Sequence, residues 1–106
     1  MKLWVDDLRP APDGWSLAVN IDRAKDALLS GRVDEASLDH GLGEGHGRAG
    51  YDLVLWMAEH GVWPERGLAV HSQNPPGAEK MCAVIERYGL YRRIRRTRRF
   101  VKRGIS

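Results

Sequence analysis

Short apolar runs alternate along the chain with segments in which apolar residues recur at helical spacing. A short apolar run bounded by turn residues predicts a buried strand, and recurrence every three or four residues predicts a helix. By these criteria we predict strands at residues 2–6, 16–19, 33–38 and 68–70, and helices at residues 21–29, 51–60 and 78–88. Alternating strands and helices predict an α/β domain with a mostly parallel sheet and right-handed crossovers.

Three segments are unsuited to a regular element. Residues 8–15 contain two prolines and a glycine, so we expect a loop where the first crossover helix of such a fold would lie. Residues 41–50 are rich in glycine and also predict a loop. Pro75, Pro76 and Gly77 are expected to interrupt the chain before the last helix.

The end of the chain differs from the rest in charge. Eight of the 17 basic residues lie between Arg92 and Arg103 with no acid among them, although the net charge is only +3. We therefore divide the chain into an α/β domain at 1–91 and a basic segment at 92–106. Its periodicity leaves open a last strand, a helix or a partly disordered tail. Such a segment either contacts nucleic acid or another anionic ligand, or is simply a solvated end.

Composition narrows the class of protein. The 106 residues are enough for one core, and 42% hydrophobic and 29% charged residues are typical of a globular domain. The apolar runs are too short to span a bilayer, and no signal-peptide pattern is present. Cys82 is the single cysteine, which suits a reducing cytoplasm, and it lies in a helical apolar pattern that favours a core position over a nucleophile.

Polar residues that could carry chemistry follow three of the predicted strands. The strands end in Asp6 and Asp7, in Asp39 and His40, and in His71 and Ser72. In open α/β sheets ligands bind outside the carboxyl ends of the strands, so these residues are expected to converge. Three neighbouring carboxylates repel one another unless a cation is bound or one is protonated. Their hard oxygens suit Mg²⁺ or Mn²⁺ with a phosphate as a further ligand.

Two histidines adjoin the predicted metal ligands. His40 and His71 would suit a phosphodiesterase, in which one deprotonates water and the other protonates the leaving oxygen. The alternative is that strand alternation turns at least one of them into the core or onto the opposite face.

The residues after the fourth predicted strand suggest a phosphate cradle. Ser72, Asn74 and the backbone near Gly77 would offer a hydroxyl, an amide and N–H groups at a helix N-terminus, a set equally compatible with a capping turn. Arg9 either reaches the phosphate or forms a salt bridge with one of the aspartates.

Four tryptophans divide by position. Trp4 and Trp56 lie within predicted elements and are expected in the core, whereas Trp15 and Trp63 lie in loop-like segments and are better candidates for stacking on a base.

The first strand end, Leu-Trp-Val-Asp-Asp-Leu-Arg at residues 3–9, resembles a two-component receiver domain. That resemblance implies a three-layer flavodoxin-like fold, shortened here by the missing first helix. It also implies Mg²⁺ on Asp6, Asp7 and Asp39, a phosphoryl acceptor at Asp39, and Ser72 at the end of the fourth strand.

A more specific resemblance is to the cyclic-phosphate-processing receiver-like family. Its motifs match at residues 4–15, 37–43, 50–52 and 71–77, and the similarity extends over about residues 2–89. It implies action on cyclic nucleotides or on the 2′,3′-cyclic phosphate ends of cleaved RNA. Asp39, His40 and His71 are the candidate catalytic residues.

Two departures from the family pattern leave alternatives open. Gly41 stands where the family usually has an aspartate, so the chain is either an enzyme or a non-catalytic module that binds a cyclic nucleotide or nucleic acid. No lysine stands at the position that a signalling receiver uses after its fifth strand, and only the arginines from Arg92 onward could replace it.

Overall fold

The computed structural model describes residues 1–39 and 49–104, which form six strands and three helices. The strands are β1 (Lys2–Val5), β2 (Trp15–Ala18), β3 (Glu35–Leu38), β4 (Gly67–Val70), β5 (Tyr91–Arg93) and β6 (Arg99–Lys102). The helices are α1 (Ile21–Leu29), α2 (Ala49–His60) and α3 (Pro75–Tyr88). The predicted α/β class, with a loop between the first two strands, is confirmed.

All six strands belong to one sheet in the order β2-β1-β3-β4-β6-β5. The first four in this order are parallel, and β6 pairs antiparallel with both β4 and β5. The basic segment is therefore a β-hairpin at the edge of the sheet. The boundary predicted after residue 91 falls inside β5. The hairpin is not a separate segment, since β6 pairs with both β4 and β5 in the same sheet.

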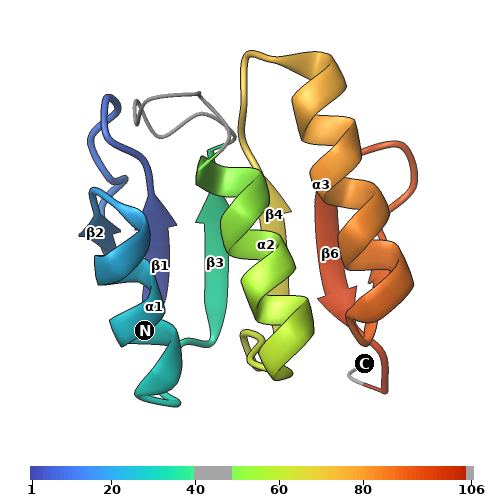
Figure 1. The fold of residues 1–106 in the computed structure, drawn as a ribbon, viewed down its shortest axis with the longest axis horizontal. Helices are drawn as coiled ribbons and strands as arrows, with labels where there is room; N and C mark the ends of the chain where they lie inside the picture. Colours follow the sequence, from blue (N-terminus) through green and yellow to red (C-terminus); the bar gives the residue numbers. More distant parts are fainter. Residues whose placement is uncertain (40–48, 105–106) are drawn as a thin grey trace.

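The three helices lie on the same face of the sheet (Figure 1). The connections from β2 to β3, β3 to β4 and β4 to β5 all cross the sheet in one direction, and right-handed crossovers therefore put their helices on one side. The connection from β1 to β2 runs the other way, but it contains no helix. The described residues thus build two layers instead of the three expected, and the second face of the sheet carries no helix.

The hydrophobic core fills the space between the sheet and the three helices. Strand alternation sends Leu3, Val5 and Leu38 into this core, where they meet apolar residues of α2 and α3. Cys82 is completely buried there, and burial raises the pKa of its thiol to about 11. The prediction that Cys82 is a core residue is confirmed.

The last helix begins earlier than predicted. Asn74 is its N-cap, accepting a hydrogen bond from the backbone N–H of Gly77, and Pro75 and Pro76 form the first turn. Proline is tolerated there because the N–H groups of a first helical turn have no partner within the helix. Gly89 ends the helix, where a Cβ would lie only 2.8 Å from the carbonyl oxygen of Ile85.

Candidate functional site

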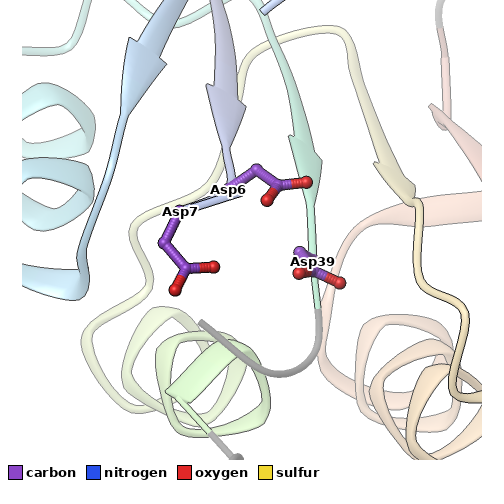
Figure 2. A group of neighbouring side chains, drawn as sticks. All are labelled: Asp6, Asp7 and Asp39. Atoms are coloured by element: carbon purple, nitrogen blue, oxygen red, sulfur yellow. The ribbon is translucent and has the colours of Figure 1, made fainter. Parts of the chain in front are cut away.

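Three aspartates meet at the carboxyl edge of the parallel strands. Asp6 and Asp7 follow β1 and Asp39 follows β3, and each offers a carboxylate oxygen within 4.8 Å of the others (Figure 2). The register explains the convergence, because Val5 at the end of β1 lies opposite Leu38 at the end of β3. The structure therefore brings together the three carboxylates that the strand ends predicted.

Asp6 is the most constrained member of this acidic cluster, with only 1% of its surface exposed. Its Oδ1 accepts hydrogen bonds from the backbone N–H groups of Leu8 at 2.8 Å and Arg9 at 3.0 Å, and its Oδ2 lies 2.9 Å from His71 Nε2. Burial raises the pKa of Asp6, but these hydrogen bonds outweigh burial and the pKa is lowered overall. Asp6 is consequently ionised at neutral pH.

Asp7 differs from Asp6 in its hydrogen bonding. Its Oδ1 is buried and has no hydrogen-bond partner in the described part of the chain. An unsatisfied buried acceptor is costly, so its presence calls for a donor or a cation beyond what residues 1–39 and 49–104 supply. A divalent cation shared with Asp6 and Asp39 would satisfy it, and three carboxylates are a suitable donor set for Mg²⁺ or Mn²⁺.

His71 connects the acidic cluster to Ser37 in β3. Its Nδ1 lies 2.7 Å from Ser37 Oγ, and its ring stacks on Trp4 with centroids 3.7 Å apart and planes inclined by 9°. Ionised Asp6 can only accept, so Nε2 carries a proton. Burial lowers the pKa of His71, and this effect exceeds the opposing influence of Asp6. The ring is then neutral, and Nδ1 accepts a hydrogen bond from the Ser37 hydroxyl.

Both nitrogens of His71 are therefore engaged by protein groups. Strand alternation puts it on the face without helices, beside Asp6, and not in the core. The predicted contact with a ligand stays a prediction. The second histidine, His40, and the departure at Gly41 lie outside the described residues.

The predicted phosphate cradle forms a capping turn. Ser72 Oγ accepts from the backbone N–H of Asn74 at 3.1 Å, and Asn74 Oδ1 accepts from the N–H of Gly77 at 3.2 Å. These groups lie just beyond β4, but they are hydrogen-bonded to one another. Their role in holding a phosphate stays a prediction.

Arg9 is exposed, and its side chain forms no ion pair with any described residue. Only its backbone N–H contacts Asp6. The alternative of a salt bridge to an aspartate is thus not found in the described part, and contact with a phosphate stays a prediction.

The sequence reasoning missed Ser37 and misplaced Trp4. Ser37 lies in β3, two residues before the Asp39 that follows this strand, and this period-two spacing could have identified it. Trp4 was expected in the core, but alternation gives that place to Leu3 and Val5. Trp4 instead lies on the face without helices, against His71.

The shortened α/β fold and its acidic strand edge define the receiver-like class. A family model described as the cyclic-phosphate processing receiver domain matches residues 1–87. The chain belongs to this family, as its motifs predicted. No curated protein and no solved structure matches it. Among the described residues, no helix has the length and apolar character needed to cross a bilayer.

Proposed function

We propose that this chain is a metal-dependent phosphodiesterase, or a binder, for a cyclic phosphate on a nucleotide or on an RNA end. Family membership supports a role in cyclic-phosphate processing. The observation that carries the metal-dependent part is the acidic cluster, with the buried Oδ1 of Asp7 unpartnered in the described residues. Such an oxygen has a physical reason to take a cation.

In this proposal Asp6, Asp7 and Asp39 hold Mg²⁺ or Mn²⁺. The bound metal would neutralise charge on the phosphate oxygens. His71 holds Asp6 in place through Nε2, since both of its nitrogens are already engaged. Arg9, whose backbone N–H contacts Asp6, has an exposed side chain that can contact the anion.

The other assigned residues complete the proposed site. Ser72, Asn74 and Gly77 would bound the phosphate on the side of β4. Hydrolysis would add water across one P–O ester bond: the water loses a proton and the released oxygen gains one, with His40 as the group assigned to this transfer.

The test is incubation with 2′,3′-cyclic nucleotides, 3′,5′-cyclic nucleotides and RNA ending in a 2′,3′-cyclic phosphate. Each is tested with Mn²⁺, with Mg²⁺ and with a chelator. Conversion to a monoester is followed by phosphorus NMR, and binding of metal and ligand by calorimetry. We expect turnover, or metal-dependent binding, for at least one of these ligands.

A matched pair of variants links the result to the acidic cluster. Asp7→Asn should weaken Mn²⁺ binding by about tenfold or more and abolish metal-dependent turnover. Asp26→Asn makes the same change at an exposed position on α1 and should behave as the wild type. Absence of both turnover and binding across the whole panel would refute the proposal.

The phosphoacceptor alternative is less well supported. In this sheet β6 lies between β4 and β5, so the residues that follow β5 are one strand further from Asp39 than in a five-stranded receiver order. Arg98 is the last residue before β6, but it donates to the Ser72 carbonyl and to Glu79. Stable phosphoryl labelling of the wild type that is lost in Asp39→Asn would revive that alternative.

A further inference from the structure

The face of the sheet without helices contains a cavity of about 530 Å³. Its origin lies in β4, which sends Leu68 and Val70 into the core and presents only Gly67 and Ala69 on the other face. A larger residue at Gly67 would be crowded, since a Cβ there would lie 3.1 Å from the Phe100 carbonyl oxygen. Because Gly67 and Ala69 are small, they leave a depression between neighbouring strands that carry larger side chains.

The walls of this cavity combine aromatic rings with cations. Trp4 and Trp15 line it from β1 and β2, with ring centroids 5.9 Å apart and planes at 80°. Arg66 and Arg99 line it on the side of β4 and β6, and neither forms an ion pair with a described residue. Its volume falls within the range of about 300–1,000 Å³ usual for small-molecule sites.

His71 adjoins both the cavity and the acidic cluster. His71 lines the cavity and stacks on Trp4, while its Nε2 contacts Asp6 at 2.9 Å. A single imidazole ring thus separates the aromatic wall from the carboxylates. A nucleotide has the same layout, with a ribose between its nucleobase and its phosphate.

We propose that this cavity, which we call the base pocket, holds the nucleobase of the ligand whose cyclic phosphate lies at the acidic cluster. The proposal rests on the function proposed above. A nucleobase offers a flat face to Trp4 and Trp15, as in proteins that stack bases on aromatic side chains. Arg66 and Arg99 complement the negative charge of a nucleotide.

The same chemistry is presented by a free cyclic nucleotide and by the terminal nucleotide of an RNA. Arg92 is exposed in β5, and its register with Val101 puts it on the cavity's face of the hairpin. It could contact further phosphates of a longer strand. Comparison of a cyclic mononucleotide with an RNA of the same terminal base separates the two sources.

The test compares 2′,3′-cyclic AMP with methyl ribofuranoside 2′,3′-cyclic phosphate, which lacks the base, by calorimetry with Mn²⁺. We expect the nucleotide to bind at least about tenfold more tightly. Ala69→Phe fills the base pocket and should remove this preference without changing affinity for the base-free compound. Ala83→Phe makes the same change at an exposed position of α3 and should have no effect.

A second variant covers the chance that Ala69→Phe does not fold. Trp15→Leu removes one aromatic wall at a half-buried position and should also reduce the preference, with circular dichroism verifying the fold. Equal affinity of the wild type for both compounds would overturn the inference.

A final arm separates this inference from the proposed function. If neither cyclic phosphate binds with metal, the proposed function fails, and AMP binding is then measured in chelator. AMP binding that is lost in Ala69→Phe and retained in Ala83→Phe would sustain the base pocket alone. No AMP binding by the wild type in that case would overturn it as well.

Discussion

The two faces of the sheet use the same strands for different purposes. On the face toward the helices, Leu38, Leu68 and Val70 are large, apolar and buried in the core. On the other face the same two strands present Ser37 and Ala69, and the cavity there is lined by aromatic, aliphatic and charged residues. Packing determines the residues of the first face. No helix of the described residues covers the second face, which leaves its residues available for a ligand site.

The largest expected effect is a difference in unfolding free energy between substitutions on the two faces of the sheet. Leu38 is completely buried, and Leu38→Ala should lower the free energy of unfolding by about 2–5 kcal/mol through lost burial and the cavity left behind. Leu17 on β2 is 49% exposed, and Leu17→Ala should change it by less than about 0.5 kcal/mol. Urea denaturation measures both. Similar losses for the two variants would contradict the distinction between the faces.

An intermediate effect is expected at Ser37, which is buried on the face without helices. Ser37→Ala removes the hydroxyl that contacts His71 Nδ1 and should cost about 1–2 kcal/mol of unfolding free energy, because that nitrogen loses its donor. Ser37→Thr keeps the hydroxyl and serves as the control. Weaker Mn²⁺ binding in Ser37→Ala with near-normal binding in Ser37→Thr would show that the polar chain also positions Asp6. An unchanged unfolding free energy would refute a structural role for this contact.

The smallest effect concerns the join between the helical layer and the basic hairpin. Arg93 pairs with Glu79 and Glu86 of α3, and Arg98 also contacts Glu79. The hydrogen bond from Arg93 is the main reason that the pKa of Glu79 is lowered. This stabilisation is therefore present above the ordinary glutamate pKa of 4.5 and is lost as pH falls through the lower folded value.

The measurement is the difference in Tm between wild type and Glu79→Gln as a function of pH. It should be greatest near neutral pH and shrink in acid, because the protonated glutamate no longer pairs with arginine. Glu59→Gln on α2 is the control, at an exposed site without an ion pair in the described residues. A difference that grows in acid would mean that the pairing does not stabilise the hairpin.

The arginines of the basic segment fall into two groups, those that pair with the rest of the fold and those that are exposed. Arg93 and Arg98 hold the hairpin against α3 and the turn at Ser72, so part of the basic segment serves folding. Arg95 and Arg96 are exposed at the turn between β5 and β6. Charge alone could not separate these two uses, because pairing depends on the acids that α3 brings alongside.

The sequence by itself determined the α/β class, the loop in place of a first helix, and the acidic residues at the ends of the first and third strands. Those features follow from local rules: strand alternation, helical periodicity, and the unsuitability of proline for a helix interior. Their consequence at the carboxyl edge could be predicted, because parallel strands bring their ends together.

Only the tertiary structure decided that the described helices all lie on one face of the sheet, that Trp4 lies against His71, and that His71 joins Ser37 to Asp6. Each depends on residues distant along the chain and on the direction in which crossovers traverse the sheet. No local sequence pattern encodes the contacts between distant residues or the direction of the crossovers. Pairing of β5 with β6 makes the basic end of the chain a hairpin, and pairing of β6 with the distant β4 joins that hairpin to the sheet.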